Sequence, residues 1–164
     1  MHKIQKIRRF EPERDSTELY EMIGKRDLYD AFPGRLEAVN AQELQNILTE
    51  RLEGYYHDLY VVEEDGTMCG FFLAYDYRVY DGHCRICGCI GDSVDCNLLK
   101  EFTDMLFEEY PLNKIFMEVT VDDWYMWRAA QEAGFASEAL LKAKRYIRGE
   151  YYDVYIMSLY PNRK

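Results

Sequence analysis

The last third of the chain constrains the fold most, because four elements follow one another there in a defined order. Residues 114–121 are rich in β-branched and aromatic side chains and too few for a stable isolated helix, so they predict a mostly buried strand. Asp122 and Asp123 end this strand and suit the start of a helix that continues to Ala133. After the Gly-Phe turn at 134–135, residues 144–148 and 152–159 predict a hairpin of two strands around a polar turn with a glycine.

Strands and helices also alternate through the first two thirds of the chain. Hydrophobic periodicity and capping residues predict a strand at 4–10, a short amphipathic helix from Asp15 or Ser16 to about Gly24, and a loop at 29–34. Asn40 and Glu43 form a capping-box pattern that opens a helix ending near Leu52. Three strands at 60–63, 68–77 and 83–90 follow, and then a helix at 96–110 that a proline stops.

Composition limits the class of protein and its partners. The 164 residues, 48% hydrophobic and 30% charged, suit one soluble globular domain over residues 1–164. No apolar stretch approaches the length that spans a bilayer, and the first residues lack a signal peptide's apolar run, so we expect a cytoplasmic protein with no membrane partner. The net charge of −10 argues against a nucleic-acid partner and favours basic amines or peptides.

The cysteines raise the question of a metal site. Cys84, Cys87 and Cys89 form a C-x-x-C-x-C pattern, and Cys96 follows seven residues later, so one interpretation is that four thiolates bind zinc. However, a strand at 83–90 turns successive side chains to opposite faces, so Cys87 and Cys89 would share a face that Cys84 does not. The better interpretation is free cysteines in a core, with no metal ligands, in a reducing compartment.

Several short motifs together suggest a family. They are Met-Glu-Val at 117–119, Ala-Gly-Phe at 133–135, Gly-Glu-Tyr-Tyr-Asp at 149–153, the strand at 155–159 and the paired strands around Asp-Gly at 59–71. In order and spacing they resemble the GNAT superfamily of acyl-CoA N-acyltransferases, most closely its branch that acetylates the N-terminal alanine of ribosomal proteins. The resemblance implies an α/β fold, with a mixed, strongly twisted sheet flanked by helices. It also implies transfer of an acetyl group from acetyl-CoA to a primary amine, either a peptide N-terminus or a small amine, by direct attack in a ternary complex.

The resemblance places acetyl-CoA at the end of the strand at 83–90 and in the turn that follows. It implies a cofactor-binding set of Cys87, Gly88, Cys89, Ile90, Gly91, Asp92, Ser93, Val94, Asp95, Cys96 and Asp123. The turn departs from the family pattern, since Gly91 takes the first glycine position but Ser93 and Asp95 take the other two. No arginine or lysine lies between Ile90 and Lys100. The carboxylates would repel a pyrophosphate unless they point away or cap the helix.

For catalysis, the resemblance implies that Glu118 acts as the base that takes the proton of the attacking amine. The alternative interpretation is that Glu118 is a solvent-facing or salt-bridged strand residue without a catalytic role. The position where the family often has a tyrosine that protonates the departing thiolate is Ala130, and Tyr29, Tyr80 and Tyr125 stay open as sources of a hydroxyl.

Two other functions stay open beside the acetyltransferase. The resemblance also places at Asp123 an asparagine that is frequent in the family. The missing glycines, asparagine and tyrosine would also fit a non-catalytic GNAT-like binding protein. A carrier-protein thioester, whose phosphopantetheine arm needs no pyrophosphate clamp, is an alternative acyl donor. The fifteen tyrosines suit either an acceptor cleft or the contact of a homodimer.

Overall fold

One seven-stranded sheet forms the centre of the protein. The computed structural model describes residues 3–162, so residues 1, 2, 163 and 164 of the predicted 1–164 domain lie outside it. The strand order is β1-β2-β3-β4-β5-β7-β6, and every neighbouring pair is antiparallel except β4 and β5. The strands are β1 Gln5–Arg9, β2 Tyr56–Glu64, β3 Thr67–Arg78, β4 His83–Cys89, β5 Lys114–Thr120, β6 Ala136–Ile147 and β7 Glu150–Leu159. The predicted mixed α/β sheet is confirmed.

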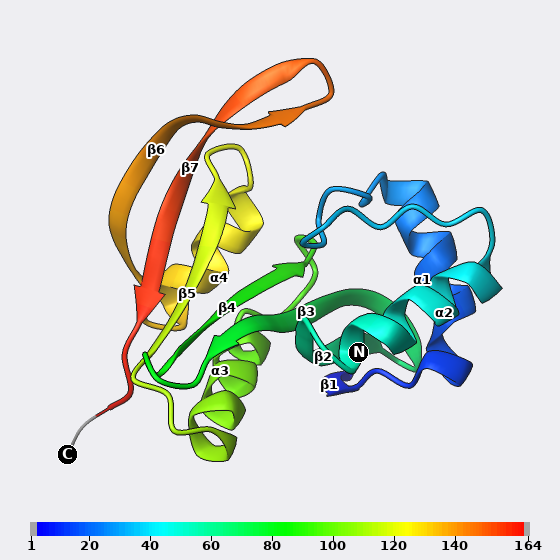
Figure 1. The fold of residues 1–164 in the computed structure, drawn as a ribbon, viewed down its shortest axis with the longest axis horizontal. Helices are drawn as coiled ribbons and strands as arrows, with labels where there is room; N and C mark the ends of the chain where they lie inside the picture. The colour runs from blue at the N-terminus through cyan, green and yellow to red at the C-terminus, as the bar shows by residue number, and fades with distance from the viewer. Residues whose placement is uncertain (1–2, 163–164) are drawn as a thin grey trace.

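Helices cover both faces of this sheet (Figure 1). The helices α1 Pro12–Arg26 and α2 Ala41–Leu52 lie on one face, and α3 Asn97–Glu109 and α4 Trp124–Glu132 lie on the other. Strand residues alternate between two hydrophobic cores, so that Leu59 and Val61 pack towards α1 and α2 while Tyr60 and Val62 pack towards α3. Within residues 3–162, none of the helices combines the length and the apolar character needed to cross a membrane.

Two predicted helix starts are confirmed by their caps. The Asn40 side chain accepts a hydrogen bond from the Glu43 amide at 2.8 Å, and the Asp123 side chain accepts one from the Met126 amide at 3.2 Å. Gly134 follows α4 with a φ of +100°, a conformation that glycine adopts without a steric penalty. Phe135 is buried against α4, as its position after the glycine predicts.

Two expected boundaries are wrong. Helix α1 begins at Pro12 rather than at Asp15 or Ser16, because a proline is well suited to the first helical position. Strand β6 spans Ala136–Ile147, whereas the sequence predicted only residues 144–148. Nearly all of β6 is exposed because it forms the edge of the sheet, so its sequence lacks the apolar alternation that marks a half-buried strand.

A β-bulge bends β6. Leu141 pairs with Val154 but Arg145 pairs with Tyr152, so β6 contains two more residues than β7 over this segment. Within the bulge Ala143 has a φ of 47°, and its amide donates to the Asp153 carboxylate at 2.8 Å. Because a bulge increases local bending and twist, the β6–β7 hairpin curves over the sheet towards the segment between α1 and α2 (Figure 1).

Candidate active site

The candidate site lies where β4 and β5 separate. These parallel strands pair only from His83 to Arg85 with Lys114 to Phe116, and beyond that point they diverge (Figure 1). A cleft of about 300 Å³ occupies the gap. Its lining residues come from the two strands, the start of α4, the α1–α2 segment and the β6–β7 hairpin: Asp27, Leu28, Asp30, Ala31, Cys87, Gly88, Met117, Glu118, Thr120, Asp122, Asp123, Met126, Arg145, Ile147 and Arg148.

A smaller pocket adjoins this cleft on the face of the sheet that α1 and α2 cover. Its volume is about 50 Å³, and Tyr75, Cys87, Glu118 and Arg145 supply its polar lining. Glu118 faces this side because its neighbours Met117 and Val119 point into the opposite core. The Glu118 side chain is 24% exposed, and its Oε1 atom lies 3.8 Å from Lys144 Nζ. Glu118 is therefore both partly solvent-accessible and part of the cleft.

Burial raises the pKa values of three groups that line the cleft or the smaller pocket beside it. Loss of hydration raises the pKa of the Cys87 thiol to about 12, although the nearby Arg145 acts in the opposite direction. Burial likewise raises the pKa of the Tyr75 phenol, and the nearby Cys87 adds to this increase. For Asp123 burial raises the pKa of the carboxyl, while the hydrogen bond from the Met126 amide opposes the change. Cys87 and Tyr75 are thus neutral at pH 7.

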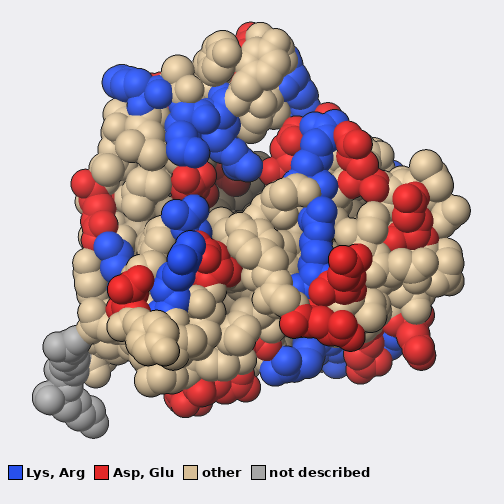
Figure 2. Space-filling model, in the orientation of Figure 1, with Lys and Arg blue, Asp and Glu red and all other residues tan. Residues whose placement is uncertain are grey.

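The hairpin and the α1–α2 segment meet above the cleft. Arg145 Nη2 donates to the Asp30 carbonyl oxygen at 2.9 Å, and Arg148 Nε donates to Asp27 Oδ2 at 2.9 Å. Figure 2 shows the hollow between these two parts, with acidic and basic side chains close together on its rim. The sequence analysis missed Arg145 and Arg148, since a contact between residues more than one hundred positions apart leaves no local pattern.

The predicted cofactor-binding residues divide into two groups. Cys87, Gly88 and Asp123 line the cleft, whereas Cys89, Ile90 and the turn at 91–96 are not among its lining residues. An added Cβ at Gly88 would lie 2.7 Å from the Phe71 carbonyl oxygen and 3.3 Å from Met126 Cε. A side chain at this position would therefore clash with β3, so the close packing beside the cleft requires glycine.

The turn at 91–96 is tied to β1 by one glutamine. Gln5 Oε1 accepts from the Asp95 amide at 2.7 Å, and Gln5 Nε2 donates to the Ser93 carbonyl oxygen at 2.5 Å. The Asp95 carboxylate accepts from the Asn97 amide at 2.9 Å, so it caps the start of α3. The amides of Asp95 and Asn97 at this helix start therefore already donate to groups of the protein rather than to an anion.

Two arginines from other elements lie near this turn. Arg26 at the end of α1 donates to the Cys69 carbonyl oxygen at 3.2 Å. Burial raises the pKa values of Cys89 and Asp123, and the charge of Arg26 opposes this rise. Arg128 on α4 interacts with Cys96 at the start of α3, and its buried Nε atom has no hydrogen-bond partner. The sequence analysis missed both residues because it looked for a cation only within the turn.

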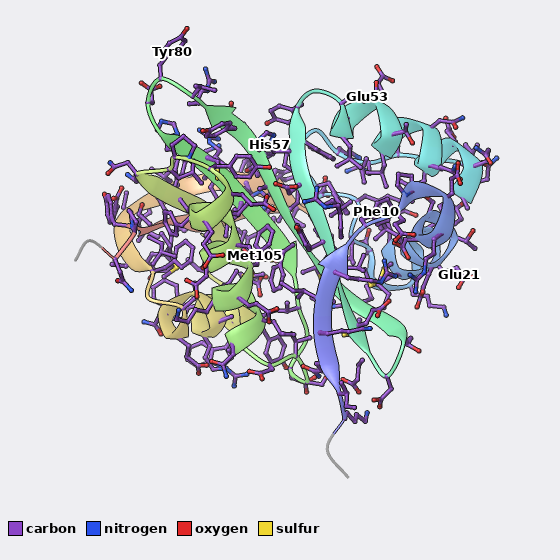
Figure 3. All side chains as sticks on the ribbon, turned by 90° about the horizontal axis from the view of Figure 1, so that it is seen from below. Phe10, Glu21, Glu53, His57, Tyr80 and Met105 are labelled. Atoms are coloured by element: carbon purple, nitrogen blue, oxygen red, sulfur yellow. The ribbon has the colours of Figure 1, made fainter. Side chains whose placement is uncertain are left out.

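The tyrosines named in the sequence analysis and the histidine on β2 lie in different environments. Tyr80 projects from the β3–β4 turn into solvent, and neither it, Tyr29 nor Tyr125 lines the cleft (Figure 3). His57 lies within β2, and its ring centre is 5.1 Å from that of Tyr77 and 4.6 Å from that of Tyr110. Tyr75 is the tyrosine that reaches the smaller pocket.

The four cysteines of the suspected metal pattern are divided between the two faces of the sheet. Cys84 and Cys96 belong to the core under α3 and α4, whereas Cys87 and Cys89 pack with the opposite core. All five cysteines are free. Among residues 3–162, no three histidine, cysteine, aspartate or glutamate side chains gather closely enough to hold a metal ion.

Comparison with known proteins gives matches in structure but not in sequence. No family model and no curated protein matches the chain. The fold is similar to that of a spermidine N-acetyltransferase from Vibrio cholerae solved with CoA and spermine, with a TM-score of 0.79 and 20% identity over 95% of each chain. It is also similar to a ribosomal-protein-S5-alanine acetyltransferase from Vibrio fischeri, with a TM-score of 0.79 and 16% identity over 98% of this chain and 97% of that one.

A third structure, an acetyltransferase of the GNAT family from Streptococcus pneumoniae, has a TM-score of 0.76 and 19% identity over 97% of this chain and 100% of that one. All three likenesses extend over nearly the whole of both chains. The chain therefore has the fold of the GNAT acetyltransferases.

Proposed function

We propose that this protein is an N-acetyltransferase that moves an acetyl group from acetyl-CoA to a primary amine. The observation that carries the proposal is the cleft between β4 and β5, which places Glu118 beside an opening in the middle of the sheet. Structurally similar proteins described as acetylating spermidine or a ribosomal protein support an amine as the acceptor.

The pantetheine arm of acetyl-CoA would lie along β4. Beyond Arg85 this strand has no ladder partner on the β5 side, so those main-chain groups of the segment at 87–88 that face β5 rather than β3 could bond an extended amide-bearing chain. The phosphates would lie near the start of α3, with Arg26 and Arg128 as their cations and Gly91, Asp92, Ser93, Val94, Asp95 and Cys96 as the surrounding turn. The unpartnered Arg128 Nε atom fits an anion at this place.

Glu118 would accept the proton that the amine must lose. The amine nitrogen forms a bond to the carbonyl carbon of the thioester, the carbon–sulfur bond breaks, and the sulfur leaves as a thiolate that takes up a proton. Tyr75 holds its phenol proton at neutral pH and lies in the same pocket, so it is the candidate donor to that sulfur. The raised pKa of Cys87 leaves it as a thiol, which favours direct attack over an acyl-cysteine.

The five cysteines are free, and free thiols are typical of a reducing compartment. They therefore support the proposal of a cytoplasmic location. A homodimer also stays a proposal.

The test is acetyl transfer by wild type and by Glu118→Gln to a panel of amines, with released CoA thiol as the readout. The change keeps the size of the side chain and removes the proton acceptor, so turnover should fall by about 100-fold or more. Affinity for acetyl-CoA, measured by calorimetry, should stay the same. Glu138→Gln on β6 is the matched control, because Glu138 also pairs with a lysine but lies outside the cleft.

Full activity of Glu118→Gln would return Glu118 to the role of a salt-bridged strand residue. If wild type binds acetyl-CoA but acetylates no amine, the non-catalytic binding protein becomes the better description. Absence of acetyl-CoA binding would instead favour a carrier-protein donor.

A further inference from the structure

Of the two arginines that line the cleft, Arg145 is the one without a carboxylate partner among residues 3–162. Its neighbours on the hairpin have carboxylates close by, since Arg148 pairs with Asp27 at 2.9 Å and Lys144 lies 3.8 Å from Glu118. Among the ion pairs of residues 3–162 none includes Arg145, whose Nη2 atom donates only to the Asp30 carbonyl oxygen. The Asp30 carboxylate is occupied by Arg35 at 2.9 Å. A partly buried guanidinium without a carboxylate retains donors for a ligand.

The structure holds this guanidinium in a fixed place. The β6 bulge bends the hairpin over the cleft, and the bond from Arg145 to Asp30 anchors one of its nitrogens. Arg145 lines both the cleft and the smaller pocket, and its charge acts against the rise that burial causes in the pKa of Cys87. The side chain is therefore directed at the space where an acceptor would lie.

Glu118 and Arg145 line the same small pocket without pairing with each other. The pocket has a volume of about 50 Å³, and Ala31, Pro33 and Ile86 contribute to its wall. A negative and a positive group that face one small space match a ligand whose own positive and negative groups are close together. An arginine fork binds a carboxylate through two parallel hydrogen bonds, whereas it repels a second ammonium group.

We infer that Arg145 determines specificity by binding the carboxylate of an α-amino acid acceptor, while Glu118 receives the amine of the same molecule. This inference rests on the proposed function, which it narrows from any primary amine to an amine with an adjacent carboxylate. A polyamine would place a second positive charge near Arg145. A peptide N-terminus would offer Arg145 only a carbonyl oxygen.

The experiment compares matched acceptors: leucine, leucinamide and isoamylamine, which share a side chain and differ in the group beside the amine. Wild type should acetylate leucine with a kcat/KM at least about tenfold above that of isoamylamine, since a charge-assisted pair is lost with the carboxylate. Arg145→Gln should lower kcat/KM for leucine by about 10- to 100-fold, mainly through KM, and leave isoamylamine unchanged. Arg145→Lys should restore part of the preference, because it keeps the charge but not the fork.

Arg14→Gln is the charge-matched control, because Arg14 on α1 lies outside the cleft and is 58% exposed. The preference for leucine should not change in this variant. The inference would be overturned if wild type had the same kcat/KM for isoamylamine as for leucine, or if Arg145→Gln left the preference for leucine unchanged. Either result would leave the proposed acetyl transfer intact. Equal use of leucinamide and leucine would overturn it in favour of a peptide N-terminus.

A second measurement separates failure of the inference from failure of the proposed function. If wild type acetylates a polyamine or a peptide but none of these three acceptors, the inference fails and the proposed function stands. If it acetylates neither these three acceptors nor any amine of the panel described above, the proposed function fails, and calorimetric titration with leucine in the presence of CoA then decides on Arg145. Binding that weakens at least tenfold in Arg145→Gln would support the carboxylate site, whereas equal binding, or none to wild type, would refute it.

Discussion

Replacing Arg8 by methionine should destabilise the protein strongly, because Arg8 neutralises two buried carboxylates. Its Nη1 and Nη2 atoms donate to Asp15 at 2.7 and 2.6 Å, and its Nε atom donates to Glu63 at 2.6 Å. The carboxylate side chains are only 2% and 5% exposed. This network joins β1, the start of α1 and β2, so it also fixes the helix whose C-terminal end borders the cleft.

The expected loss in the free energy of unfolding is about 3 kcal/mol. Removing one partner of a buried ion pair costs about 3–5 kcal/mol, because the other charge stays in a poorly hydrated place. The lower end of this range applies, because both carboxylates retain other partners in the variant. Glu63 still lies 3.7 Å from Lys6 and 3.9 Å from Arg14, and Asp15 still accepts a hydrogen bond from the Glu11 amide at 2.7 Å. For a chain of this size that loss corresponds to a fall in Tm of about 6–12 °C.

The measurement is urea unfolding followed by circular dichroism at pH 7, with Arg78→Met as the control. Arg78 is 60% exposed and pairs with Asp76, so its replacement should cost less than about 1 kcal/mol. Burial acts to raise the pKa of Asp15, but hydrogen bonds from Arg8 and the Glu11 amide outweigh it and hold the pKa below 3.8. The stability that Arg8 provides should therefore be present above pH 3.8 and decline as the pH falls below it. A loss at pH 7 no larger than that of the Arg78 control would refute the argument.

Two further predictions concern groups that shape the cleft. Asp153→Ala removes the acceptor of the Ala143 amide in the bulge, so it should cost about 0.5–1.5 kcal/mol of stability. Steady-state kinetics should show a higher KM for the amine and an unchanged KM for acetyl-CoA. The same KM for the amine in the variant and in wild type would mean that the hairpin keeps its place without Asp153. Asp123→Asn keeps an N-cap acceptor and removes a buried charge, so stability at pH 7 should equal or exceed that of wild type, whereas Asp123→Ala should lose about 1 kcal/mol. Because burial raises the pKa of Asp123, the advantage of the asparagine variant should grow as the pH rises above 3.8 and disappear below it; a pH-independent difference in urea unfolding would contradict this.

The sequence could predict the parts of the fold that local physics determines. The Asn40 and Asp123 caps, the glycine after α4 and the buried strand β5 each depend on residues within a few positions of one another. The extent of β6 could not be predicted in this way. Its residues are exposed on both faces, so no hydrophobic periodicity distinguishes this edge strand from a loop.

For the candidate site, the strand alternation could predict that Cys87 and Glu118 lie on β4 and β5, but not which groups would face them. Tyr75 comes from a third strand, and Arg145 reaches the pocket because of a bulge that Asp153 stabilises across the hairpin. Likewise, the cations near the turn at 91–96 come from α1 and α4. These arrangements depend on contacts between distant segments, and such contacts are set by the packing of the whole sheet.

Because the hairpin and the α1–α2 segment meet above the cleft, the residues that would contact the amine and the strands that would hold the acyl donor belong to separate parts of the chain. The floor of the cleft is built by the central strands, whereas its roof comes from segments near opposite ends of the sequence. Substitutions in the roof can change which amine enters without altering the strands that would hold the acyl donor. Selection for a new acceptor would therefore act on two surface segments, and the shared chemistry of the sheet would stay as it is.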